Sequence, residues 1–163
     1  MEHQAPALFV WLEQSAFAQA IRQSLWIYPA ANVGHILSLV AFAGSIAVMD
    51  VRLLGGFAAT APARILVRAR RFAIAAFVGM AITGFILFAA EASHLAMNRV
   101  FQLKFALIAA GLANLAIYEL WAKHAVMNLP PNVAIPSQAR VAGVVSLGLW
   151  LAVAACGRSI AYF

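Results

Sequence analysis

The stretch Phe72–Ala90 reads FAIAAFVGMAITGFILFAA and contains no charged side chain. A bilayer core about 30 Å thick is crossed by roughly 20 residues of α-helix, so this run is long enough to cross it once. Three further apolar runs follow the same pattern: Val33–Met49, Phe105–Tyr118 and Val141–Gly157. Because backbone groups in lipid must find hydrogen-bond partners within the protein, each run is expected to be helical. The sequence therefore predicts an all-α integral membrane protein with four spans.

Composition supports one membrane domain over residues 1–163. Hydrophobic residues make up 65% of the chain and charged residues 10%, whereas a soluble domain carries about 25% charged residues. Apolar residues at helical spacing also precede the first span, and the Tyr28-Pro29 pair is expected to end that segment. We predict an antiparallel four-helix bundle with an N-terminal amphipathic interfacial helix; the interfacial helix covers 7–27 and the spans cover 31–55, 70–92, 99–122 and 139–162.

The distribution of positive charge predicts the orientation of the spans. The net charge is +6, and basic residues gather after the first span, where only Asp50 opposes Arg52, Arg64, Arg68, Arg70 and Arg71. Lys and Arg accumulate in cytoplasmic loops. This connection is therefore expected in the cytoplasm and both termini on the opposite side. This pattern reflects topology, so no nucleic-acid partner is expected.

Motifs of soluble enzymes are absent from the sequence. There is no Gly-rich phosphate loop, HExxH or CxxC, and the single cysteine, Cys156, excludes an intramolecular disulfide. We therefore assign no catalytic residue and do not expect an enzyme. No cleavable signal peptide is expected, because the first residues lack a basic stretch followed by a continuous apolar run.

Two histidines are the main candidates for a cofactor site. His35 lies one turn inside the first predicted span and His94 at the end of the second, so both belong to the outer leaflet, whereas His124 lies at the opposite face. Facing histidines on antiparallel helices suit a six-coordinate haem b. Three basic side chains at the outer end could pair with its propionates: Arg22, Arg99 and Arg158.

Two alternatives to haem stay open at this point. Glu91, His94 and Met97 are spaced i, i+3, i+6 and would share one side of a helix that continues through them. Together with His35 they offer oxygen, imidazole and thioether ligands, a set that copper accepts. Alternatively, His35 hydrogen-bonds to a neighbouring helix and His94 is solvated. An ionisable residue within a span is nevertheless a functional candidate by default.

Several short segments carry a family resemblance across almost the whole chain. They are Trp11-Leu12-Glu13, Trp26-x-Tyr28-Pro29, Met49–Gly55, Thr83-Gly84-Phe85, Asn98-x-x-Phe101-Gln102-x-Lys104 and Gly157–Phe163. Their order resembles a family of small, uncharacterised four-helix bacterial membrane proteins, more distantly similar to the CopD-type copper-resistance membrane domain and to membrane b-type cytochromes. The resemblance implies a multi-pass protein of the bacterial inner membrane, with both termini periplasmic. It draws attention to His35, Asp50, Arg52, Lys104, Asn114 and Arg158.

These observations predict a membrane b-type cytochrome-like protein that carries one electron at a time, with haem near the periplasmic face. The alternatives are a copper-handling membrane protein and a structural or accessory subunit of a larger membrane complex. The expected partners are the lipid bilayer, a membrane redox partner or larger complex, and a second copy of the chain. In the family, a histidine often lies at the cytoplasmic end of the third span. Glu119 lies near that place here, which argues against a second, cytoplasmic haem.

Overall fold

The computed structural model describes residues 5–160, which form helices and no strand. The elements in order are α1 (Ala7–Gln14), α2 (Ala16–Gln23), α3 (Ile27–Leu53), α4 (Pro62–Ala90), α5 (Ala92–Met97), α6 (Arg99–Ile117), the π-helix η1 (Tyr118–Ala122), α7 (Lys123–Met127) and α8 (Ser137–Ser159). The all-α prediction is confirmed.

Among residues 5–160, four helices are long and apolar enough to cross a membrane: Ile27–Leu53, Pro62–Ala90, Arg99–Met127 and Ser137–Ser159. Each contains one of the four apolar runs, so the prediction of four long apolar helices is confirmed and indicates a membrane protein. The second begins at Pro62 rather than at residue 70, because proline needs no N–H partner in a first turn. Arg64 and Arg68 therefore lie on α4 itself.

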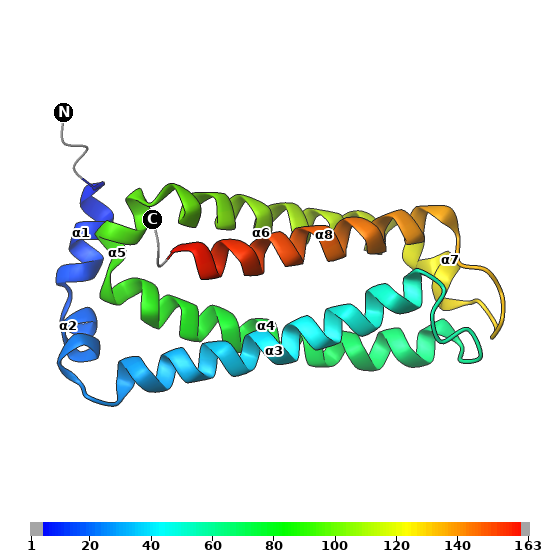
Figure 1. The fold of residues 1–163 in the computed structure, drawn as a ribbon, viewed down its shortest axis with the longest axis horizontal. Coiled ribbons are helices and arrows are strands. Elements are labelled where there is room, and N and C mark those ends of the chain that lie inside the picture. The colour runs from blue at the N-terminus through cyan, green and yellow to red at the C-terminus, as the bar shows by residue number, and fades with distance from the viewer. Residues whose placement is uncertain (1–4, 161–163) are drawn as a thin grey trace.

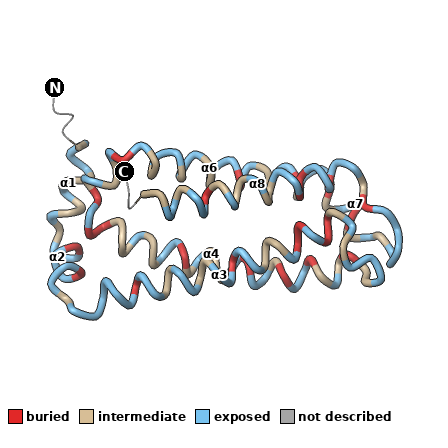
Figure 2. Tube along the Cα trace, viewed as in Figure 1, coloured by how far each residue is buried: buried red, intermediate tan, exposed pale blue. Residues whose placement is uncertain are grey.

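The four long helices form two packed pairs, and the two pairs contact each other through α3 and α8. Helix α3 lies against α4 and α6 lies against α8, while α3 also packs on α8 (Figure 1). Helices α4 and α6 make few contacts along their length. Buried residues lie scattered along the long helices, and most of the remaining positions are exposed or half-buried (Figure 2). Much of the apolar surface of these helices is therefore not covered by other parts of the same chain.

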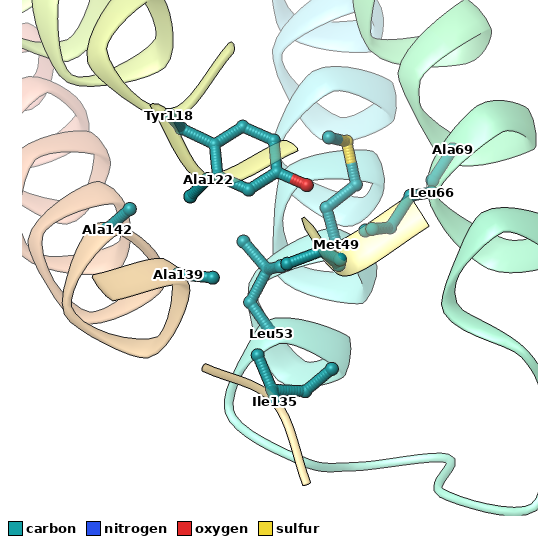
Figure 3. Close-up of a cluster of buried hydrophobic side chains, with 10 residues drawn as sticks. Met49, Leu53, Leu66, Ala69, Tyr118, Ala122, Ile135, Ala139 and Ala142 are labelled. Carbon is teal, nitrogen blue, oxygen red and sulfur yellow. The ribbon is translucent and has the colours of Figure 1, made fainter. Parts of the chain in front are cut away.

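The largest cluster of buried apolar side chains lies at the α7 end of the molecule. Met49 and Leu53 of α3 meet Leu66 of α4 there, and Tyr118 reaches in from the opposite pair of helices (Figure 3). A second cluster, at mid-length, centres on Phe42, Ala73 and Met80. A third, at the opposite end, joins Ile21 of α2 to the last turn of α4.

The N-terminal segment differs from the single interfacial helix predicted over 7–27. It forms two helices, α1 and α2, because the Ser15 hydroxyl donates to the Leu12 carbonyl at 2.6 Å and accepts from the Ala18 N–H at 3.2 Å. A serine at this position ends one helix and caps the next. Pro29 does not end a helix. It lies in the first turn of α3, where backbone N–H groups have no partner within the helix, so its missing N–H costs no hydrogen bond.

Helix α3 ends at Leu53, just before the Gly55-Gly56 pair. Gly55 has a φ of 105°, the left-handed conformation that glycine adopts without a steric penalty. The Gly56 N–H donates to the Val51 carbonyl at 2.8 Å and the Gly55 N–H to the Arg52 carbonyl at 3.2 Å, the two bonds of a Schellman motif. The buried Arg52 guanidinium donates to the Thr60 carbonyl at 3.1 Å and so holds the following loop.

Candidate functional site

The ring of His35 is held by a chain of hydrogen bonds between α3 and α4. Its Nδ1 lies 3.0 Å from the Thr83 hydroxyl oxygen, and that hydroxyl donates to the Gly79 carbonyl at 2.7 Å. Because the Thr83 proton is committed to Gly79, we assign the proton of this contact to His35 Nδ1. The Nε2 atom then carries the free lone pair, which is the state that a metal-ligating imidazole requires.

Small residues allow α3 and α4 to approach closely around this ring. A Cβ atom on Gly84 would lie 3.1 Å from His35 Cε1, and one on Gly79 would lie 2.7 Å from the Ser38 hydroxyl oxygen. On the facing helix, a Cβ on Gly34 would lie 3.2 Å from Thr83 Cγ2. These close approaches place glycines of both helices at the α3–α4 contact.

His94 takes no part in the contact between the His35 ring and Thr83. His94 lies exposed on α5, and the contact found for the His35 ring runs to Thr83 of α4. His94 lies on α5, and His35 lies in the first half of α3; α3 begins at the end of the molecule that carries α5 (Figure 1). His124 lies on α7 at the opposite end, as predicted.

The expected helical spacing of Glu91, His94 and Met97 is interrupted. Helix α4 ends at Ala90, and Glu91 has φ −140° and ψ 39°, so it separates α4 from α5. His94 and Met97 remain one turn apart on α5, while Glu91 precedes that helix. Within residues 5–160, no group of three His, Cys, Asp or Glu side chains is arranged to hold a metal ion.

The three arginines that were expected to pair with haem propionates have different surroundings. Arg22 donates to the Ala90 carbonyl at 3.0 Å and to the Glu13 carbonyl at 2.8 Å, so its guanidinium joins α2 to the end of α4 and to α1. Arg99 and Arg158 are exposed, at the first turn of α6 and the last turn of α8. Both of these turns lie at the end that carries α5 (Figure 1).

Glu13 attaches α1 to α5 beside these residues. Its carboxylate accepts from the Ser93 N–H at 2.8 Å and from the Ser93 hydroxyl. These two hydrogen bonds, with a smaller contribution from Arg22, hold the pKa of Glu13 below its usual value of 4.5. Nothing in the local sequence pairs Glu13 with Ser93, so sequence reasoning missed this contact.

A family model described as a family of unknown function (DUF6644) matches residues 8–163. The chain belongs to this family. No curated protein and no solved structure matches it. Membership of DUF6644 confirms the expected relationship to proteins without an assigned function, and it assigns no role to His35 or to any other residue. The more distant resemblance to CopD-type domains and b-type cytochromes stays a prediction.

Proposed function

We propose that this chain is a bacterial inner-membrane protein whose four long helices cross the bilayer as an antiparallel bundle. The lengths and apolarity of the helices support membrane insertion. Arg52 in the last turn of α3 and the arginines in the first turns of α4 support a cytoplasmic location for that end. Helix α1 and the end of α8 lie at the other end (Figure 1), which is then the periplasmic side.

Within this bundle, we propose that His35 is an axial ligand of haem b near the periplasmic face. The observation that carries this proposal is the His35–Thr83–Gly79 hydrogen-bond chain, which orients the ring and leaves the lone pair on Nε2. Haem b, when bound, supplies one-electron redox chemistry at its iron. The chain's own contribution is to bind and orient the group: His35 as ligand, Arg99 and Arg158 as positive charge at the same end.

A second imidazole at this end of the molecule would complete the ligand set of the haem. His94 is the candidate, because it is the other histidine at this end among residues 5–160. A histidine pair gives a six-coordinate haem, and His35 alone gives a five-coordinate one. The electron would pass between a membrane partner and a periplasmic acceptor.

The absorption spectrum of the purified protein, oxidised and reduced, tests this proposal. A Soret band with α and β bands on reduction is expected. His35→Ala should abolish or strongly reduce these bands, and His94→Ala should convert a six-coordinate spectrum to a five-coordinate one or lose the haem. His124→Ala is the matched control and should retain the wild-type spectrum. An unchanged spectrum in His35→Ala would refute the assignment.

A copper-handling protein is the second candidate function. Its specific support is that His94 and Met97 lie one turn apart and exposed on α5, where imidazole and thioether could bind one ion. Elemental analysis would favour it if copper is present and the haem bands are absent. If neither is found, the remaining candidate is an accessory subunit, for which Leu120 and Trp121, each 79% exposed, offer an apolar assembly surface.

A further inference from the structure

A cavity of about 250 Å³ lies between all four long helices, and His35 does not line it. Aromatic rings form much of its wall. The ring centroid of Phe42 lies 4.6 Å from that of Trp150 and 5.6 Å from that of Phe77, and all three side chains line the cavity. Such a wall favours a ligand with a ring, since aromatic groups pack edge to face or offset against one another.

Two buried polar side chains in the cavity wall each carry an oxygen atom without a hydrogen-bond partner among the described residues. Asp50 of α3 and Tyr118 of η1 are 4% and 6% exposed, and both line the cavity. In the described part of the chain, neither Asp50 Oδ2 nor the Tyr118 hydroxyl makes a hydrogen bond. Ser146 bonds to the Asp50 carboxyl group, and the Tyr118 ring extends from its helix towards Met49 of α3 (Figure 3). Leaving buried polar atoms unpaired is unfavourable, so a molecule that pairs with both would be stabilised here.

The backbone at Tyr118 departs from regular α-helical geometry. Residues Tyr118–Ala122 form a π-helical turn within an otherwise α-helical span. Single π-turns interrupt the regular hydrogen-bond pattern and occur frequently at functional sites. In the turn before it, the Asn114 side chain lines the same cavity.

The cavity has an apolar margin between α4 and α6, the two neighbours that make few contacts. Four of its lining residues are substantially exposed on these helices: Ile74, Val78, Leu112 and Leu115. If the helices cross a bilayer, as the proposed function holds, this margin faces hydrocarbon. A membrane-soluble molecule could then enter sideways. An acyl chain could enter as well, but it would leave Asp50 and Tyr118 unpaired.

We propose that this cavity binds a small aromatic molecule that carries a hydroxyl group. Its ring lies among Phe42, Phe77 and Trp150. Its polar group donates to Asp50 Oδ2 and accepts from the Tyr118 hydroxyl. The site rests on membrane insertion for access and does not depend on haem at His35.

Fluorescence of Trp150 can report on this site directly. The other three tryptophans are exposed, Trp11 at 68%, Trp26 at 80% and Trp121 at 79%, so each can be replaced by phenylalanine. The full chain carrying these changes and His35→Ala, which removes the proposed haem ligand, is reconstituted in nanodiscs. It is then titrated with hydroquinone and, separately, with toluene. We expect saturable quenching by hydroquinone and a weaker response to toluene.

Tyr118→Phe tests the polar contact, because it removes one unpaired oxygen and keeps the ring. The affinity for hydroquinone should fall by about two- to tenfold, the range expected for one hydrogen bond. Tyr28→Phe is the matched control at a tyrosine outside the cavity and should leave the affinity unchanged. Non-saturable quenching, equal affinity for toluene, or wild-type affinity in Tyr118→Phe would each overturn the proposal. Failure of the haem proposal would appear only in the absorption spectra of the His35 protein, so the two tests are separable.

Discussion

Asn114 of α6 donates its side-chain amide to the backbone carbonyl of Ala142 on α8 over 3.0 Å. The two helices approach closely beside this bond, because a Cβ on Gly111 of α6 would lie 3.0 Å from the Trp150 ring of α8. The polar contact therefore fixes the rotation and depth of one helix against the other.

Replacing Asn114 should loosen this helix pair. Asn114→Ala is expected to lower the free energy of unfolding by about 0.6–2 kcal/mol, the range for side-chain hydrogen bonds between helices in membranes. The free energy of unfolding can be measured by unfolding the protein in mixed micelles that contain increasing amounts of SDS. Asn32→Ala, at an exposed asparagine of α3, is the control and should change the midpoint little. Equal midpoints for the two variants would contradict the structural role of the Asn114 bond.

Close packing of α3 on α4 gives a second prediction. Gly79→Val should lower stability by about 1–3 kcal/mol, because its Cβ would meet the Ser38 hydroxyl oxygen at 2.7 Å and force the helices apart. Gly44→Val is a matched control, since nothing lies within 4 Å of a Cβ at that position. Thermal unfolding of both variants in the same detergent distinguishes them. The prediction fails if Gly44→Val loses as much stability as Gly79→Val.

Thr83 provides a test of the hydrogen bond to His35. Thr83→Val keeps the shape of the side chain and removes the hydroxyl, so the His35 ring loses the contact that sets its tautomer. If haem is bound as proposed, its affinity should fall by about 10–100-fold, the usual effect of losing a partner that orients a ligand. Haem titration of the apoprotein measures this change. Thr60→Val, in the α3–α4 loop, should bind haem like the wild type, and equal affinities for all three proteins would exclude the role of Thr83.

The Glu13–Ser93 contact predicts a dependence on acid pH. The pKa of Glu13 is lower in the folded protein than its usual value of 4.5, so the contact stabilises the docking of α1 above that pH. This stabilisation should disappear as the pH falls through the lowered pKa. Hydrogen exchange of residues 7–23, followed from pH 6 to pH 3 and corrected for the pH dependence of the intrinsic exchange rate, should then show lower protection at the acid end. Glu13→Gln should exchange faster already at pH 6, with a smaller change on acidification; a variant that follows the wild-type profile would argue against this contact.

Membrane orientation can be measured with single cysteines in a Cys156→Ser background. Ala59→Cys, in the α3–α4 loop, should react only with a reagent that reaches the cytoplasm. Gln14→Cys, at the end of α1, should react with an impermeant reagent added from the periplasm. These outcomes follow from the excess of arginine near the loop. Labelling of Ala59→Cys from the periplasm would reverse the proposed topology.

Part of the candidate site was predictable from the sequence. His35 and Asn114 stand out because a polar side chain within an apolar run needs a partner, and both have one on another helix. Their partners, Thr83 and the Ala142 carbonyl, were not predictable, since the period of a helix does not specify its rotation against a neighbour. For the same reason Tyr118 and Ser146 attracted no attention, although Tyr118 follows Asn114 by one helical turn.

The sequence by itself determined the four long apolar helices, the Gly55 termination of α3 and the gathering of arginines near one end. Each of these depends on neighbours along the chain: the length of an apolar run, the backbone freedom of glycine, and the local count of charge. Only the tertiary structure decided that Glu91 separates α5 from α4, that Glu13 meets Ser93, and that Asp50 and Tyr118 line one cavity. These relationships depend on the depth and rotation at which separate helices pack, because a contact between distant segments exists only once both are positioned in space.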